Sequence, residues 1–225
     1  MSKQLSTLSK THRSPLEKIR VYLITDRSQM PERDFLGGIE AALSGGVRSI
    51  QLREKDLAPS ELLPLAREVK KLTRKYGAHL LINDRVDVAD MVGADGVHLT
   101  EASLPAHEVK KHYPHLLLGV STHSLDKARR AQEEGADFVT FSPVFDTVSK
   151  REYGPPQGLD KLREVTREIN IPVLALGGIQ EDRVSAVLHH GAFGIALISG
   201  IWKSSHIENE SVKYMHHFQQ ESSHD

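Results

Sequence analysis

Two short apolar segments near the end of the chain, each stopping at glycine, constrain the fold more than any other feature. Residues 171–179 read IPVLALGGI, and residues 194–200 read GIALISG. An apolar run of about four to eight residues without polar alternation is typical of a strand buried on both faces of a parallel sheet. Each run therefore predicts a strand of an α/β protein whose sheet is covered by helices.

The glycines that end these runs predict an anion-binding site. Gly177 and Gly178 leave bare backbone amides after the first run, and Ser199 and Gly200 do so after the second. Exposed amides beside the start of a helix bind anions, and in a (β/α)₈ barrel the loops after the last two strands bind phosphate. We therefore expect a phosphate cup here, although the glycines could serve only to end the strands.

Length and composition fit one α/β barrel domain. The chain has 225 residues, 26% of them charged and 39% hydrophobic, and a net charge of −1. Such a charge provides no basic field for nucleic acid, and no apolar run is long enough to span a membrane. The chain has no cysteine, which excludes disulfides and thiol chemistry and fits a reducing cytosol. We expect a cytoplasmic protein without nucleic-acid or membrane partners.

Strand and helix patterns alternate about eight times, which favours closure into a (β/α)₈ TIM barrel over an open sheet. The predicted strands are residues 21–25, 49–52, 79–82, 93–99, 116–120, 138–141, 171–179 and 194–200. We expect a single barrel domain over residues 19–220, preceded by a flexible extension at residues 1–18.

A weak internal repeat, a glycine followed by another small or apolar residue, precedes several predicted strands. The glycines are Gly46, Gly77, Gly93, Gly135 and Gly191. Glycine commonly ends a helix because it adopts the left-handed conformation without strain. We expect each of these glycines to end a helix in that conformation.

Polar side chains follow the predicted strands at their carboxyl ends, the functional face of this architecture. They are Arg53, Lys55, Asn83, Asp84, Ser121, His123, Thr147, Ser149 and Lys150. Three cations at one rim exceed what a single phosphate needs, which predicts a diphosphate ligand. Asp84 is then a candidate Mg²⁺ ligand, since Mg²⁺ typically binds one or two carboxylates plus phosphate oxygens. Some of these residues, Ser121 among them, could instead cap helices.

These motifs resemble those of the superfamily of thiamine phosphate synthase and its close relative thiazole tautomerase. The matching segments are residues 51–55 (QLREK), 82–85 (INDR), 96–99 (GVHL), 119–123 (GVSTH), 143–145 (PVF), 147–150 (TVSK), 154–158 (GPPQG), 175–179 (ALGGI) and 198–199 (IS). The resemblance implies a (β/α)₈ barrel of thiamine biosynthesis. The synthase uses Mg²⁺ to join a hydroxymethylpyrimidine diphosphate to a thiazole phosphate, releasing diphosphate, whereas the tautomerase isomerises the thiazole phosphate precursor.

The resemblance also implies a role for each matching residue. It assigns the pyrimidine diphosphate to Gln51, Arg53, Lys55, Asn83, Ser121 and Lys150, and Mg²⁺ to Asp84. It assigns the thiazole phosphate to Thr147, Ser149, Gly178, Ile198 and Ser199. Arg53, Ser121 and Lys150 would form the catalytic set. Cations and metal would stabilise the departing diphosphate, and the thiazole nitrogen, held nearby, would capture the electron-poor carbon.

Two positions depart from these patterns. The second Mg²⁺ aspartate of the synthase pattern is Ser103 here, and Glu101 could replace it or be a solvated loop carboxylate. Ser103 resembles the tautomerase branch, yet the position of the tautomerase acid/base histidine is Pro143. We expect a synthase, with a tautomerase or a non-catalytic binding or regulatory barrel as alternatives. The sequence leaves open the role of His123 and whether the chain forms a homo-oligomer.

Overall fold

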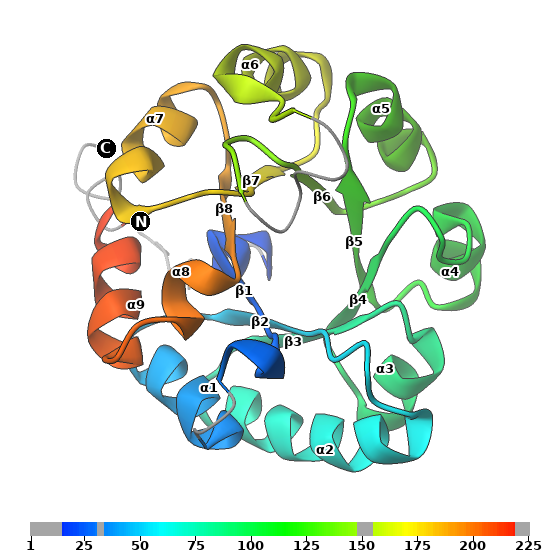
Figure 1. Ribbon diagram of the computed structural model, residues 1–225. Coiled ribbons are helices and arrows are strands. Elements are labelled where there is room, and N and C mark those ends of the chain that lie inside the picture. The colour runs from blue at the N-terminus through cyan, green and yellow to red at the C-terminus, as the bar shows by residue number, and fades with distance from the viewer. Residues whose placement is uncertain (1–14, 31–33, 148–154, 219–225) are drawn as a thin grey trace, which may run out of the picture.

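A closed barrel of parallel strands forms the centre of the molecule (Figure 1). The computed structural model describes residues 15–30, 34–147 and 155–218. Strands β1 to β8 pair in chain order, and β8 pairs with β1, so that the sheet closes on itself. This confirms the predicted (β/α)₈ TIM barrel in a single domain. None of the described helices combines the length and hydrophobicity that a membrane span requires.

The elements alternate as the sequence predicts. The strands are β1 (Val21–Ile24), β2 (Ser49–Leu52), β3 (His79–Asn83), β4 (Gly96–Leu99), β5 (Leu117–Thr122), β6 (Phe138–Phe141), β7 (Val173–Leu176) and β8 (Gly194–Leu197). The α-helices are α1 (Phe35–Ser44), α2 (Pro59–Lys75), α3 (Val86–Val92), α4 (Ala106–His112), α5 (Leu125–Glu133), α6 (Gly158–Glu168), α7 (Val184–His189), α8 (Ser199–Trp202) and α9 (Ile207–His216). Short 3₁₀ helices are η1 (Pro15–Ile19), η2 (Arg27–Gln29) and η4 (Glu181–Arg183).

The helices form an outer ring, with α9 packed against α1 and α8 (Figure 1). Of the expected amino-terminal extension, residues 15–18 lie in η1, and residues 1–14 lie outside the described residues. Each glycine of the internal repeat has a positive φ, between 61° and 102°, which confirms the predicted left-handed helix ends.

Strand β5 differs from its prediction in a way that matters for the site. The sequence predicts that the strand ends at Val120, because the next three residues are polar. In the structure β5 continues to Thr122, since Ser121 and Thr122 pair with Thr140 and Phe141 of β6. Ser121 therefore lies within a strand and not in the loop after it.

Two apolar layers hold the barrel together. The larger lies between the strands and the surrounding helices and includes Leu23 and Val97. The smaller lies inside the barrel and includes Tyr22, Leu81 and Phe138. Because side chains on both faces of the strands are buried, the strands read as continuous apolar runs. Polar side chains in the barrel interior are the exception, and they belong to the candidate site.

Candidate active site

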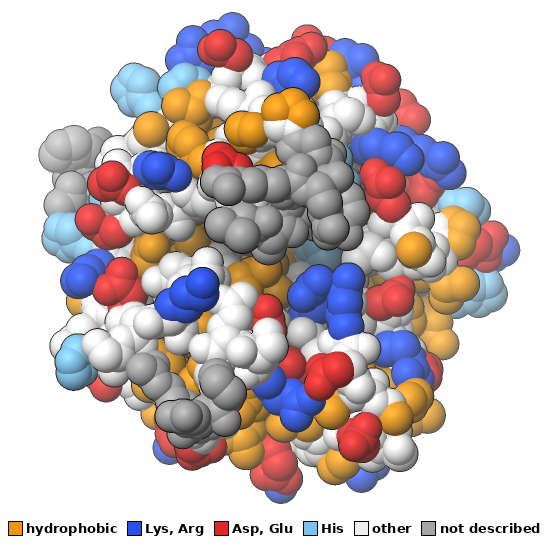
Figure 2. Space-filling view, in the orientation of Figure 1, with side chains coloured by type: hydrophobic (Ala, Val, Ile, Leu, Met, Phe, Trp, Pro, Cys, Tyr) orange, Lys and Arg blue, Asp and Glu red, His pale blue; other side chains and the backbone are white. Residues whose placement is uncertain are grey.

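The carboxyl ends of the parallel strands meet at one end of the barrel, here called the mouth. The structure places there Arg53 after β2, Asn83 and Asp84 at the end of β3, Ser121 in β5, Thr147 after β6, Gly178 after β7, and Ile198 and Ser199 after β8. Lys55 lies on the exposed rim. Figure 2, in the orientation of Figure 1, shows basic and acidic side chains interspersed around the middle of the viewed face. Ser149 and Lys150 lie outside the described residues, so their placement stays a prediction.

A series of hydrogen-bonding side chains crosses the barrel interior below the mouth. Gln51 Nε2 donates to Tyr22 Oη at 3.1 Å. Tyr22 Oη lies 3.4 Å from His98 Nδ1, and His98 Nε2 lies 3.0 Å from Ser121 Oγ. The series joins β2, β1, β4 and β5. It connects two predicted site residues, Gln51 and Ser121, through Tyr22 and His98.

Tyr22 and His98 are both held in their neutral forms. Burial, with a smaller contribution from the positive charge of Arg53, lowers the pKa of His98 to about 3. Burial also raises the pKa of Tyr22, and the hydrogen bond from Gln51 opposes this only in part. His98 lies in the buried strand β4 and is only 2% exposed. Neither the hydrogen bond between His98 and Ser121 nor the place of Tyr22 in the series was predicted.

Glu54 fastens the loops after β1 and β2 to each other. Thr25 Oγ1 donates to Glu54 Oε1 at 2.5 Å, and the backbone and Nε of Arg27 donate to Glu54 Oε2 at 3.1 and 3.2 Å. Arg53 joins through its backbone amide, which donates to Thr25 Oγ1 at 2.9 Å. Burial raises the pKa of Glu54 despite these hydrogen bonds. The network thus holds the loop that carries Arg53 and Lys55 beside a hollow of about 450 Å³.

Glu54 was not among the predicted site residues. It lies between two cations just past a strand, where a carboxylate is usually solvated, whereas the structure leaves it only 7% exposed. The one sequence signal for its role was its position two residues after the buried strand β2.

Asp84 is held in an unusual backbone conformation at the end of β3. Its φ is 63°, in the left-handed region that residues other than glycine seldom adopt. Its amide donates to the carbonyl of His98 at 2.9 Å, while its side chain is exposed. Strain of this kind is concentrated at functional sites. Within the described residues no three His, Cys, Asp or Glu side chains form a group able to hold a metal ion. Asp84 would therefore need phosphate oxygens and water to complete a Mg²⁺ shell, which is how Mg²⁺ is commonly bound.

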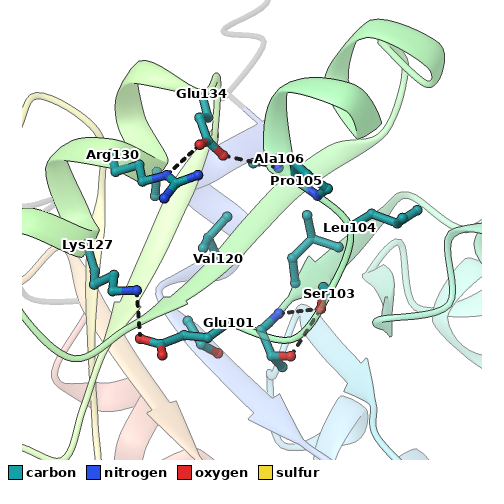
Figure 3. Close-up of a pocket in the computed structure, with 13 residues that line it drawn as sticks. Glu101, Ser103, Leu104, Pro105, Ala106, Val120, Lys127, Arg130 and Glu134 are labelled. Carbon is teal, nitrogen blue, oxygen red and sulfur yellow. Dashed lines mark hydrogen bonds and ion pairs between the residues drawn. The ribbon is translucent and has the colours of Figure 1, made fainter.

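Ser103 and Glu101 each have a local partner. Ser103 Oγ accepts a hydrogen bond from the Thr100 amide at 2.7 Å and so closes a turn after β4 (Figure 3). Glu101 lies 3.8 Å from Lys127 of α5. Both residues line a pocket of about 200 Å³ between this turn and α5. Figure 3 shows Lys127 directed at Glu101 and Arg130 at Glu134, so these charges of the pocket are paired with each other.

The expected phosphate cup lies where β7 and β8, which are neighbours, both end. Gly177 and Gly178 have φ values of 98° and 64°. Helix α8 begins at Ser199, and the amides of a first helical turn lack intrahelical acceptors. The glycines also have a packing role: a Cβ at Gly178 would lie 2.7 Å from the carbonyl oxygen of Asp146. Arg183 secures this loop, since its Nη1 donates to the Gly178 carbonyl at 2.8 Å.

His123 and Pro143 lie on the same side of the rim. His123 Nδ1 is 2.7 Å from the carbonyl oxygen of Ser142, an acceptor, so Nδ1 carries a proton and donates it. His123 is thus tied to the backbone just after β6. Pro143 has no group that exchanges a proton, so the position of the tautomerase acid/base histidine is chemically inert.

Comparisons with known proteins show the family to which the chain belongs. A family model described as thiamine monophosphate synthase matches residues 21–201. A relative from Geobacter sulfurreducens, provisionally named a thiamine-phosphate synthase, is 53% identical over 182 residues, covering 80% of this chain and 85% of that protein. The thiamine-phosphate synthase of Alkaliphilus oremlandii is 40% identical over 196 residues, covering 86% of this chain and 93% of that protein.

A solved structure, the thiamine phosphate pyrophosphorylase from Pyrococcus furiosus, superposes with a TM-score of 0.83 at 34% identity. The superposition covers 90% of this chain and 96% of that one. The family model spans all eight strands, from the start of β1 to the helix after β8. This chain belongs to the thiamine monophosphate synthase family.

Proposed function

We propose that this chain is a thiamine-phosphate synthase, a transferase of thiamine biosynthesis. It condenses hydroxymethylpyrimidine diphosphate with thiazole phosphate to give thiamine phosphate and diphosphate. The observation that carries the proposal is the family match over residues 21–201 together with the gathering of the expected residues at the mouth. The substrates are small phosphorylated molecules, in keeping with the cations there.

The pyrimidine diphosphate is proposed to enter the barrel with its ring toward the interior. Gln51 and Asn83 offer hydrogen-bonding groups to the ring below the rim, and Arg53, Lys55 and Lys150 offer positive charge around the diphosphate. The hydroxyl of Ser121 is proposed to contact the diphosphate as well. As the bond from the methylene carbon to the diphosphate oxygen breaks, these cations stabilise the charge that develops on the leaving group. The thiazole nitrogen then bonds to the same carbon, and the positive charge remains on the thiazolium ring.

One Mg²⁺ fits the donor set at the mouth. Asp84 would hold it, with diphosphate oxygens and water as the other ligands, and the ion would neutralise part of the leaving-group charge. Ser103 contributes little to such a site while its hydroxyl closes the turn with Thr100.

The thiazole phosphate is proposed to bind on the opposite side of the mouth. Its phosphate would occupy the cup formed by Gly178, Ile198 and Ser199, and Thr147 and Ser149 would contact the substrate. Holding the thiazole nitrogen close to the electron-poor carbon supplies much of the rate through orientation.

The tautomerase alternative has less support. Ser103 is its one favourable feature, but Pro143 exchanges no proton at the position where a tautomerase needs one. The cytoplasmic location expected from the sequence stays a prediction.

The test is product formation by the purified full-length chain. Incubation with both substrates and Mg²⁺ should give thiamine phosphate and diphosphate in equal amounts, detected by mass spectrometry, and omission of either substrate should give none. A parallel incubation with the thiazole phosphate precursor alone tests isomerisation. Product in the second incubation alone would contradict the synthase proposal and support the tautomerase.

A further inference from the structure

The hydrogen bonds of the series inside the barrel have a direction, which is set by which atom of each pair donates. The members of the series are Gln51, Tyr22, His98 and Ser121, and the first three are at most 2% exposed. Tyr22 pairs edge-on with Phe138, with ring centroids 5.5 Å apart, and the ring of His98 lies beside both, 5.6 Å from Tyr22 and 5.8 Å from Phe138. Water therefore has little access to the middle of the series, and each polar atom depends on its neighbour in the series.

His98 determines that direction. A neutral imidazole carries one proton, so one ring nitrogen donates while the other accepts. If Nδ1 accepts from Tyr22, Nε2 must donate to Ser121. If Nδ1 donates to Tyr22, Nε2 must accept from Ser121.

Gln51 selects between the two directions. Its Nε2 donates to Tyr22 Oη, which leaves the hydroxyl proton of Tyr22 for His98 Nδ1. His98 then carries its proton on Nε2 and donates to Ser121 Oγ. The hydroxyl proton of Ser121 is left to point elsewhere. Thr140, the register neighbour of Ser121, does not take it, since the buried Thr140 Oγ1 has no hydrogen-bond partner among the described residues.

We propose that Tyr22 and His98 are positioning residues, which turn Ser121 into a hydrogen-bond donor directed at the mouth. This rests on the proposed function, in which Ser121 contacts the diphosphate. An anionic oxygen accepts hydrogen bonds, so a hydroxyl that donates attracts it. If the hydrogen bonds ran in the opposite direction, the Ser121 hydroxyl would donate to His98 and would present only lone pairs to the diphosphate.

The tautomer of His98 tests the proposal without any enzyme assay. In protein labelled with ¹⁵N-histidine, long-range ¹H–¹⁵N correlation distinguishes a protonated ring nitrogen from a bare one. We expect one histidine with protonated Nε2 and bare Nδ1 that shifts toward a mixture of tautomers in Tyr22→Phe, which identifies it as His98. A His98 signal with protonated Nδ1 overturns the proposal.

A double-mutant cycle tests the consequence for catalysis. Tyr22→Phe and Ser121→Ala should each lower kcat/KM for the pyrimidine diphosphate by about tenfold or more. The double variant should be no slower than Ser121→Ala alone, because Tyr22 acts through Ser121. Multiplied losses would mean that Tyr22 acts independently, which overturns the proposal.

Tyr76→Phe is the matched control. The Tyr76 hydroxyl bonds to Glu40 at 3.1 Å on the outside of the barrel, so its loss should leave kcat/KM and the His98 tautomer unchanged. A wild-type chain that forms no product would refute the proposed function, whereas the tautomer would still decide the direction of the series.

Discussion

Asp95 Oδ2 accepts a hydrogen bond from the backbone amide of Leu80 at 2.8 Å, at the end of the barrel opposite the mouth. Asp137 Oδ2 accepts an equivalent bond from the Leu118 amide at 2.7 Å. Each aspartate follows the Gly-Ala pair of the internal repeat and precedes a strand. The repeat therefore turns the chain at the helix end and also links the aspartate to the start of the preceding strand.

Acid should weaken this link at Asp95. Burial opposes ionisation, but hydrogen bonds from His79, the Leu80 amide and Lys70 outweigh it and hold the pKa of Asp95 below its usual range. A depressed carboxyl pKa stabilises the fold fully above the unfolded value of about 4, and this stabilisation is lost as pH falls below it. Asp95→Ala should lower the free energy of unfolding by about 1–3 kcal/mol at pH 7.

Urea unfolding of the wild type and Asp95→Ala at pH 7 and pH 3 measures this effect. The difference in free energy between the two proteins should shrink at pH 3. A difference that stays constant or grows on acidification would show that the Asp95 charge contributes nothing.

Gly178 should be required both for its left-handed backbone conformation and for the space that a side chain there would fill. Gly77 has nearly the same φ, 61° against 64°, but a Cβ there would meet nothing within 4 Å. Gly77→Ala should cost about 1–2 kcal/mol for the left-handed conformation and leave the rate unchanged. Gly178→Ala should cost more, because its Cβ meets the Asp146 carbonyl, and should weaken thiazole phosphate binding. Urea unfolding and calorimetric titration measure both; equal costs with unchanged binding would place the cup elsewhere.

Arg53 should discriminate between the two substrates. Arg53→Ala should raise KM for the pyrimidine diphosphate by about tenfold or more, because a charge-assisted hydrogen bond to phosphate is lost. KM for the thiazole phosphate should change little. Arg129→Ala on α5, which removes an exposed ion pair with Glu168 at the end of α6, is the control and should change neither. Equal effects of Arg53→Ala on both substrates would mean that the two phosphate sites are not separate.

Most of the fold could be predicted because its determinants are local. An apolar run marks most of the strands, and a glycine such as Gly93 marks the end of a helix. The rim could be predicted for the same reason, since residues that follow parallel strands, such as Arg53 and Asp84, must share one end of the barrel.

The barrel interior could not be predicted in this way. The strand β1 is buried on both faces, so no alternation marks Tyr22 as an inward side chain. Its partner His98 lies 76 positions further along the chain, and the two meet only when the barrel closes. The position of Ser121 within a strand could not be predicted either, because the polar residues after Val120 indicate a loop, whereas pairing with β6 extends the strand. Ser149 and Lys150 stay predictions.

The most direct test of the synthase proposal is the initial rate of thiamine phosphate formation as Mg²⁺ is titrated. A single metal carboxylate should bind Mg²⁺ weakly, so the wild type should need a high Mg²⁺ concentration. Ser103→Asp should lower that requirement and raise the rate, since an aspartate there can still accept from the Thr100 amide. Asp84→Asn should nearly abolish activity. Ser103→Ala, which removes only the hydrogen bond that closes the turn, should not lower the Mg²⁺ requirement. No product at any Mg²⁺ concentration from the wild type or Ser103→Asp, in folded protein, would contradict the synthase proposal.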